Sequence, residues 1–158
     1  METTTIERMV EADAEQVADL WLELIGEHAE CDRKYFTTYR RNHKRKIQLL
    51  MVALKDPLEQ VWVARANGQI IGYCSAYVSY VTGIYNSHID ATLGDIYVAP
   101  GYRSSGIGKR LLNEAQGWSS LMEADKLRLN VHSANSAAID YYRKNGFEEK
   151  FKVMTITL

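Results

Sequence analysis

One segment of the sequence combines arginine, serine and glycine residues in an order that suits the binding of an anion. It reads Arg103-Ser104-Ser105-Gly106-Ile107-Gly108 and follows an apolar run that ends at Pro100-Gly101. Glycines at a helix start leave the first backbone N–H groups uncovered, and these groups have no partner within the helix. Together with the helix dipole they form a site for a phosphate or pyrophosphate. Arg103 adds a fork of donors that matches phosphate oxygens.

This R-x-x-G-x-G pattern also fits a helix start that binds nothing. Two other kinds of nucleotide site are excluded by what the pattern lacks. The phosphate loop of nucleotide hydrolases needs G-x-x-x-x-G-K-[ST], which does not occur in the sequence. A dinucleotide fingerprint needs a third glycine and a long series of strand–helix–strand units, and neither is present.

A second segment, residues 135–147, places polar side chains on a predicted helix. It reads N-x-x-A-x-x-Y-Y-x-x-x-G-F. On a helix, Asn135 and Tyr142 lie on one face, two turns apart. Asn135 either caps this helix or bonds an amide group of a ligand. Tyr142 either packs in the core or presents its hydroxyl to the same groove, and the residues alone leave these alternatives open.

Hydrophobic periodicity predicts the elements that position these two segments. Apolar runs predict strands near residues 3–10, 61–66, 69–81, 89–99, 127–131 and 147–158. Apolar residues at helical spacing predict helices over about 13–28, 33–54, 105–123 and 136–144. Asn67-Gly68 predicts a tight hairpin, because both residues accept a positive φ. The late strand–helix–strand unit has to cross over, so its strands pair in parallel. We therefore expect an α/β (α+β) fold, a mixed sheet with helices on both faces.

Together the two segments resemble the GNAT superfamily, the Gcn5-related N-acetyltransferases. The loop resembles the acetyl-CoA motif of that family, and Tyr142-Arg143-Lys144-Asn145-Gly146-Phe147 resembles its second motif, in the same order and spacing. The resemblance implies a single N-acetyltransferase domain over 1–158, with acceptor-side helices in 1–60 and an acetyl-CoA-binding core in 61–152. It also implies a mostly antiparallel sheet of six to seven strands, in which the parallel strands near 93–98 and 127–132 splay apart.

The resemblance also assigns residues to the cosubstrate, acetyl-CoA. Backbone amides of the loop would hold the pyrophosphate, and the preceding strand edge would pair with the pantetheine arm. Asn135 would bond this arm, and Tyr142 would lie beside the thioester sulfur. The implied acetyl-CoA-binding residues are Ile96, Tyr97, Val98, Arg103, Ser104, Ser105, Gly106, Ile107, Gly108, Lys109, Asn135 and Tyr142.

The implied reaction is the direct attack of a primary amine on the thioester through a tetrahedral intermediate. The amine has a pKa near that of lysine, about 10.4, so it must first lose a proton. Asp95 is the predicted base, directly or through a water molecule, and Asp90 is the second choice. Tyr142 would protonate the leaving thiolate, and the Val98 amide would polarise the carbonyl oxygen. A purely structural acid is the alternative for Asp95.

The charge distribution gives a clue to the acceptor. Residues 1–32 carry a net charge of −9, residues 33–46 carry +7 and the remainder carries +1, which add to −1. An acidic helix would attract a cationic amine, although a solvated helix face also explains these residues. They are Glu23, Glu27, Glu30 and Asp32. The predicted acceptor is a small (poly)amine or aminoglycoside-like molecule, and a protein or peptide amine is the alternative.

Two other classes of function stay open on the sequence. A non-catalytic acyl-CoA-sensing domain would keep the loop without needing Tyr142. A nucleic-acid-binding module would rest on the basic run of 33–46 alone, which a solvent-exposed face also explains, and the chain as a whole is not basic.

The remaining features concern metal, compartment and assembly. The four histidines lack the spacing of metal ligands, so no metal is expected. Two unpatterned cysteines, with no visible signal peptide and no membrane-spanning run, predict a cytoplasmic protein without a membrane partner. Homodimers are common in the family that the chain resembles, so a homodimer is expected.

Overall fold

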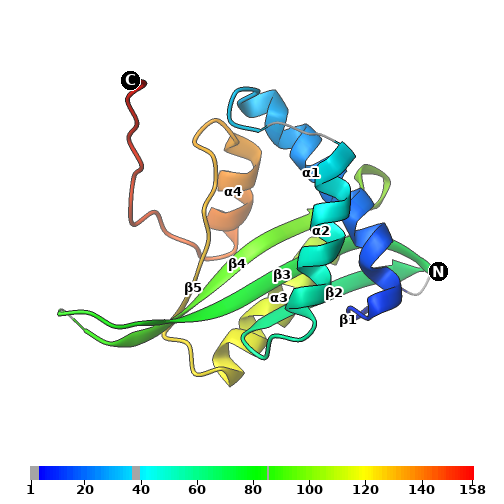
Figure 1. The fold of residues 1–158 in the computed structure, drawn as a ribbon, viewed down its shortest axis with the longest axis horizontal. Coiled ribbons are helices and arrows are strands. Elements are labelled where there is room, and N and C mark those ends of the chain that lie inside the picture. Colours follow the sequence, from blue (N-terminus) through cyan, green and yellow to red (C-terminus); the bar gives the residue numbers. More distant parts are fainter. Residues whose placement is uncertain (1–3, 37–39, 85) are drawn as a thin grey trace.

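The computed structural model describes residues 4–36, 40–84 and 86–158. This described part forms one five-stranded sheet in the order β1-β2-β3-β4-β5 (Figure 1). The strands are β1 (Thr5–Arg8), β2 (Glu59–Ala66), β3 (Gln69–Val81), β4 (His88–Val98) and β5 (Lys126–Arg128). Neighbours pair antiparallel from β1 to β4, whereas β5 pairs parallel to β4. The predicted mixed, mostly antiparallel sheet is confirmed, with five strands in place of six to seven.

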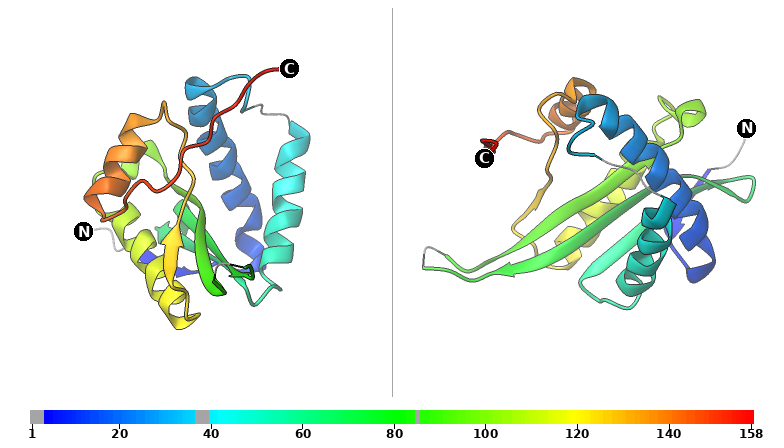
Figure 2. Two further views of the ribbon diagram at one scale, coloured as in Figure 1. Left: turned by 90° about the vertical axis from the view of Figure 1, so that its left-hand side faces the viewer. Right: turned by 45° about the horizontal axis from the view of Figure 1, so that its top comes forward.

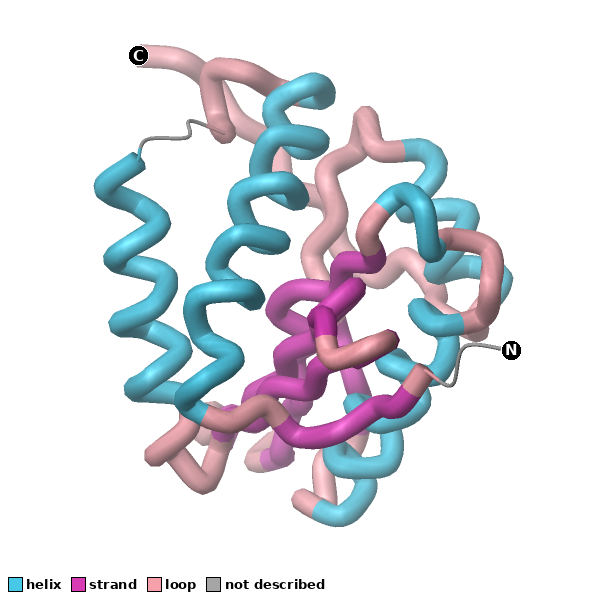
Figure 3. The backbone as a smooth tube through the Cα atoms, turned by 90° about the vertical axis from the view of Figure 1, so that its right-hand side faces the viewer, coloured by secondary structure: helices cyan, strands magenta, loops and turns pink. Residues whose placement is uncertain are grey.

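Helices cover both faces of this sheet. α1 (Ala14–Cys31) and α2 (Arg40–Ala53) lie on one side, and α3 (Ile107–Leu121) and α4 (Ser136–Lys144) lie on the other (Figure 2, Figure 3). Strand alternation explains the two layers. In β2, Val61 and Val63 pack with α1 and α2, whereas Trp62 and Ala64 pack with α3. None of the described helices has the length and apolar character needed to span a membrane.

A bulge in β4 decides which side chains reach the face covered by α1 and α2. Two residues of β4, Gly94 and Asp95, stand opposite the single residue Ser75 of β3. Leu93, before the bulge, packs with α3, whereas Tyr97, after it, packs with α1 and α2. Strict alternation would have put both on one face. The extra residue therefore turns Asp95 and Tyr97 toward α1 and α2.

β4 and β5 are paired at one end only. Their ladder joins Asp90–Thr92 to Lys126–Arg128, and β4 then continues to Val98 with no described strand on that side. The Ala99 N–H donates to β3, so alternation turns the N–H groups of Val98 and Ile96 toward the open side. The parallel pair that separates after a short ladder, as the family resemblance implies, is thus present.

The second helix is shorter than predicted. α2 begins at Arg40 rather than near residue 33; residues 33–35 form a turn, and residues 37–39 lie outside the described part. Asp32 explains the turn, because its Oδ1 accepts the N–H groups of Lys34 and Tyr35 at 3.0 and 3.1 Å. Such a bond from a side chain to the local backbone competes with helix formation.

The final strand predicted over 147–158 is not formed. Phe147 is the last residue that packs on the core, and its N–H donates to Tyr142. The chain beyond it runs away from the body (Figure 1, Figure 2). A strand needs a neighbour for its backbone groups, and no described residue pairs with this segment. The strands predicted over 3–10 and 127–131 are present but shorter, as β1 and β5.

Candidate active site

The loop between β4 and α3 presents an uncovered helix N-terminus. Gly106, at a φ of 83°, is the N-cap residue of α3, and no side chain caps the first helical N–H groups. Ser104 also has a positive φ, 62°, and residues 103–106 are exposed. The free N–H groups and the positive end of the α3 dipole therefore face solvent, as the motif predicts.

The second glycine of the motif has a packing role. A Cβ at Gly108 would lie 3.3 Å from the Tyr141 hydroxyl and 3.9 Å from Val98 Cγ2. Glycine therefore lets the first turn of α3 approach both α4 and the end of β4. The Tyr141 hydroxyl at this contact is buried and has no hydrogen-bond partner among the described residues. The contact joins the loop to the second sequence motif.

Arg103 points toward α1 rather than outward over the loop. Its Nε donates to the Val98 carbonyl at 2.7 Å, and its Nη2 lies 2.6 Å from the Glu27 carboxylate. The guanidinium also lies over the ring of Tyr97, 5.2 Å from the centroid. In this arrangement Arg103 ties the loop to α1, and its donors are engaged by the protein instead of being free for the phosphate that the sequence pattern assigns to them.

Asp95 is paired with a lysine that the sequence pattern assigns to an exposed basic run. Lys46 Nζ, from α2, lies 2.7 Å from Asp95 Oδ2, and the two side chains are only 14% and 23% exposed. The ammonium also faces the rings of Trp21 and Tyr73, 5.5 and 5.9 Å from their centroids. The Asp95 N–H donates to Ser75 Oγ at 3.0 Å, which holds the bulge in place. One carboxylate and two aromatic faces thus enclose a single ammonium group.

Acidic residues of α1 belong to the same face of the sheet. The Tyr97 hydroxyl donates to Glu23 at 3.0 Å and to Glu27 at 3.3 Å. Burial and the hydrogen bond with Glu23 raise the pKa of Tyr97 well above its usual value. Burial and the charge of Asp95 do the same to the pKa of Tyr73, whose hydroxyl has no hydrogen-bond partner in the described part of the chain. Both phenols therefore keep their protons near neutral pH.

Tyr142 lies between α4 and the core. Its ring packs edge-on against Tyr141 and Phe147, with 5.5 Å between centroids in each pair. Burial raises the pKa of Tyr142 well above its usual value, and the neighbouring Tyr141, Cys74 and Asp95 raise it further. The phenol therefore holds its proton at neutral pH, which is the state that a general acid needs.

Asn135 and Asp90, both predicted as candidate site residues, make contacts that stabilise the fold. Asn135 caps α4, its side chain accepting the Ala138 N–H at 3.1 Å. Asp90 lies at the paired end of β4 and β5 with its side chain 3% exposed, and Lys126 Nζ and Arg128 Nη1 lie 3.2 and 3.8 Å from its carboxylate oxygens. These ion pairs join the two strands just before they separate.

Lys46 and His28 are site residues that the sequence patterns did not single out. His28 Nδ1 is buried without a hydrogen-bond partner in the described part of the chain, and burial lowers the pKa of this side chain. Its ring lies 4.9 Å from that of Phe36, on whose edge His132 also packs. Helical spacing gives a signal for both: His28 follows Leu24 by one turn on the inward stripe of α1, and Lys46 precedes Leu50 by one turn on that of α2.

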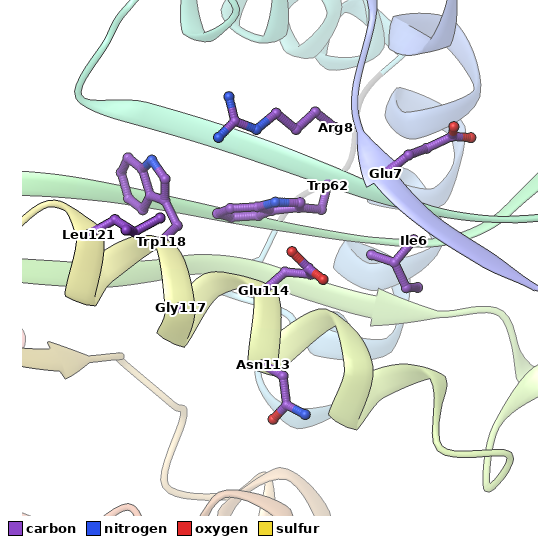
Figure 4. Close-up of a pocket in the computed structure, with 9 residues that line it drawn as sticks. All are labelled: Ile6, Glu7, Arg8, Trp62, Asn113, Glu114, Gly117, Trp118 and Leu121. Atoms are coloured by element: carbon purple, nitrogen blue, oxygen red, sulfur yellow. The ribbon is translucent and has the colours of Figure 1, made fainter.

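A surface hollow of about 540 Å³ lies elsewhere, between β1, β2 and α3 (Figure 4). It is lined by the rings of Trp62 and Trp118 and by the charged side chains of Glu7, Arg8 and Glu114. No residue of the loop or of the bulge lines it, so it is separate from the candidate site. Within the described residues no group of three or more histidine, cysteine, aspartate or glutamate side chains could hold a metal ion.

A comparison with protein families agrees with this geometry. The Acetyltransferase (GNAT) family matches residues 18–147, which is most of the chain. The chain belongs to the GNAT acetyltransferase family. Its members are N-acetyltransferases that use acetyl-CoA as the acetyl donor. The GNAT assignment made from the two sequence motifs is therefore confirmed.

Individual relatives and solved structures are similar to parts or all of this GNAT chain. The uncharacterized N-acetyltransferase MJ1207 of Methanocaldococcus jannaschii is 29% identical over 97 residues, 61% of this chain and 42% of that protein. Streptothricin acetyltransferase of Streptomyces lavendulae is 39% identical over 82 residues, 52% of this chain and 40% of that protein. The chain thus spans about two fifths of the length of these two relatives.

A solved structure of an aminoglycoside N-acetyltransferase, AAC(6')-Iy in complex with CoA, has the same fold. It superposes with a TM-score of 0.78 over 100% of this chain and 96% of that chain, at 19% sequence identity. At this identity the likeness extends to the fold alone.

Proposed function

We propose that this GNAT domain transfers the acetyl group of acetyl-CoA to a primary amine of a small polyamine or aminoglycoside-like molecule. One observation carries the proposal: the open edge of β4 runs from the uncovered N-terminus of α3 to an ammonium group held by Asp95 between aromatic rings. The names of two similar proteins, a streptothricin and an aminoglycoside acetyltransferase, support a cationic small-molecule acceptor.

The chain's own backbone would bind the donor. The N–H groups from Ser104 to Lys109 would hold the pyrophosphate, because no side chain caps the start of α3; the Arg103 N–H, also assigned to this role, already donates to the Pro100 carbonyl at 3.3 Å. The N–H groups of Ile96 and Val98 would pair with the pantetheine arm, because no described strand covers that side of β4. The bound phosphates would compete with Glu27 for the Arg103 guanidinium, which lies at the same loop.

The acceptor amine would take the place of the Lys46 ammonium. Asp95 would then accept the proton of the acceptor, directly or through a water molecule. The neutral amine would attack the thioester through a tetrahedral intermediate, with the Val98 N–H polarising the carbonyl oxygen. Tyr142, whose raised pKa keeps its phenol protonated, would donate that proton to the leaving thiolate.

An acceptor with several ammonium groups suits the face of the sheet covered by α1 and α2 better than an acceptor with one. Glu23 and Glu27 lie beside Tyr97 on the side of the sheet to which Asp95 points, so a second ammonium group of the acceptor has a carboxylate partner. A protein or peptide amine would place one ammonium group at Asp95 and would gain less from these acids.

The test measures thiol release from acetyl-CoA with a panel of monoamines, polyamines, aminoglycosides and a lysine-containing peptide. Tyr142→Phe should lower kcat by about 10²- to 10⁴-fold, the usual contribution of a general acid, and Asp95→Ala should lower it similarly. Tyr141→Phe is the matched control, because the Tyr141 hydroxyl has no described hydrogen-bond partner to lose. Coenzyme A binding, followed by calorimetry, should be unchanged in Asp95→Ala and Tyr141→Phe; for Tyr142→Phe, at a residue also assigned to acetyl-CoA binding, kcat is compared at saturating acetyl-CoA.

Two outcomes would contradict the proposal. If the protein binds coenzyme A but no amine releases thiol, the domain is an acyl-CoA sensor. If Tyr142→Phe has full activity, the general acid is another group.

We also infer that the protein is a homodimer that works in the cytoplasm. Cys31 and Cys74 are both free thiols in the structure, which suits a reducing compartment.

A further inference from the structure

Lys46 of α2 differs from the other lysines of the chain in its surroundings. All the lysines lie in the described ranges, and every one of them except Lys46 is exposed. The Lys46 side chain is 14% exposed, and its Nζ lies 2.7 Å from Asp95 Oδ2. The rings of Trp21 and Tyr73 lie beside the ammonium group, with their centroids 5.5 and 5.9 Å from Nζ. The fold thus brings one of the chain's own primary amines to the carboxylate that we propose as the base.

The same amine lies near the position expected for the acetyl donor. Asp95 is followed by Ile96, whose N–H group faces the open side of β4. The charge of Asp95 contributes to the raised pKa of Tyr142, so this phenol lies within electrostatic reach of the carboxylate. Once neutral, the Lys46 amine is a nucleophile held between the proposed base and the edge along which acetyl-CoA would bind.

We propose that the domain acetylates its own Lys46 when acetyl-CoA is bound and no acceptor amine is present. The inference rests on the acetyl-transfer chemistry proposed above and adds a modification site to it. It does not depend on which external amine is the substrate, because the nucleophile belongs to the chain.

The step balances with acetyl-CoA as the co-reactant. The Lys46 ammonium gives one proton to Asp95, and the nitrogen lone pair forms a C–N bond with the acetyl carbonyl carbon. The C–S bond then breaks, and the thiolate takes the proton of Tyr142. The nitrogen loses its second proton as the amide forms, and Tyr142 regains one. The products are acetylated Lys46, coenzyme A and a proton released to water.

Acetylation would change the charge beside Asp95. An acetylated lysine carries no charge and cannot form a salt bridge. The modification therefore removes the cation that competes with an external ammonium group for this carboxylate.

The test incubates the full chain with acetyl-CoA that carries an isotopically labelled acetyl group, without any amine, and maps the acetylated lysines by peptide mass spectrometry. Lys46 should be acetylated about 100-fold faster than the exposed Lys44 of the same helix, because a positioned base contributes at least this factor. The rate per chain should not change with protein concentration, since each chain modifies itself. Acetyl groups that Lys46 already carries after purification count as acetylation.

Three results of this experiment would overturn the proposal. They are a Lys46 without any acetyl group, equal acetylation of Lys46 and Lys44, and a rate per chain that rises in proportion to protein concentration.

Variants separate catalysed transfer from ordinary chemical acetylation. Asp95→Asn should lower the rate at Lys46 by about 100-fold, the contribution of the base, and should leave the slow rate at Lys44 unchanged. Tyr142→Phe, a second variant of the same machinery, should also lower the rate at Lys46 alone. Lys44→Arg is the matched control and should leave the acetylation of Lys46 as it is. Circular dichroism should show that each variant is folded. Acetylation of Lys46 at the unaltered rate in both Asp95→Asn and Tyr142→Phe would contradict the inference.

The readout on Lys46 is separate from thiol release with the amine panel. If amines of the panel release thiol but Lys46 stays unmodified, the inference is wrong and the proposed function stands. If Lys46 is acetylated but no amine of the panel releases thiol, the inference stands and the proposed class of acceptor is wrong. If neither occurs although coenzyme A binds, both are wrong.

Discussion

At the scale of single residues, the charge pair between Asp95 and Lys46 shows how one side chain balances the charge of another. Both side chains are mostly buried, at 14% exposure for Lys46 and 23% for Asp95, and their charged atoms are 2.7 Å apart. A buried carboxylate without a cation is costly, so Asp95 needs an ammonium partner while it is ionised. Lys46 supplies it in the free protein, and the proposed acceptor supplies it during the reaction.

Lys46→Met tests this pairing through stability. The substitution leaves the Asp95 carboxylate without its cation, so we expect the free energy of unfolding to fall by about 1–3 kcal/mol in urea denaturation at pH 7.5. Lys44→Met, on the exposed side of the same helix, is the matched control and should stay within about 0.5 kcal/mol of the unaltered protein. Equal effects of the two substitutions would contradict a structural pairing.

His28 makes stability depend on pH. Burial lowers its pKa in the folded chain below the usual value of about 6.5, so the unfolded chain binds the proton more readily. The contribution of neutral His28 is therefore complete above about pH 6.5 and is lost as the pH falls through the lowered pKa. His28→Gln should lose less stability than the unaltered protein between pH 7.5 and pH 5.5 in denaturation curves. A parallel loss in both proteins would show that His28 does not cause it.

At the scale of elements, the loop and α3 form the structural unit that the proposed donor site needs. Gly106 supplies the left-handed residue before the helix, and Gly108 supplies the close approach to Tyr141. Gly117, in the interior of the same helix, has open space where a Cβ would lie and no positive φ. The three glycines therefore respond differently to the same substitution.

Gly117→Ala and Gly106→Ala test this difference. Gly117→Ala should raise the free energy of unfolding by about 0.5–1 kcal/mol, because alanine favours helix. Gly106→Ala should lower it by about 1–2 kcal/mol, because a side chain is strained at a φ of 83°. It should also weaken coenzyme A binding, as measured by calorimetry, whereas Gly117→Ala should not. Equal coenzyme A affinity in the two variants would place the phosphates elsewhere.

At the scale of the whole molecule, acidic and basic residues are concentrated in separate segments of the sequence, and the fold brings some of them together as ion pairs. The acidic and basic segments form α1 and α2, which pack side by side, and His43 of α2 lies 2.8 Å from Asp19 of α1. The Lys46–Asp95 pair uses part of the basic run inside the protein, whereas the His43–Asp19 pair lies at the surface. The structure thus accounts for part of that run without any nucleic acid.

The dependence of KM on salt concentration should show whether the acids of α1 attract the acceptor from a distance. A polyamine acceptor drawn toward the acids of α1 should show a KM that rises several-fold between 50 and 500 mM NaCl, because salt screens the attraction. A monoamine acceptor, measured in parallel by thiol release at saturating acetyl-CoA, should change much less. The same increase for both acceptors would mean that the acids of α1 play no part in attracting the substrate.

Local chemistry determined much of this protein from the sequence alone. Asn67 and Gly68 adopt φ of 49° and 78° and make the predicted hairpin, and Gly146 ends α4 at a φ of 88°. The R-x-x-G-x-G loop precedes its helix as predicted, because helix starts and tight turns depend on neighbours in the sequence. The GNAT fold follows from the order of such elements, and the family match confirms it.

Only the tertiary structure decided where Asp95 points and where the chain's end goes. Alternation along β4 predicts that Asp95 shares a face with Leu93, but the bulge opposite Ser75 turns it toward Lys46. A bulge is a property of two strands in register, and a strand at residues 147–158 needs a neighbour to exist at all. Both depend on residues distant in the sequence, so no local pattern could specify them.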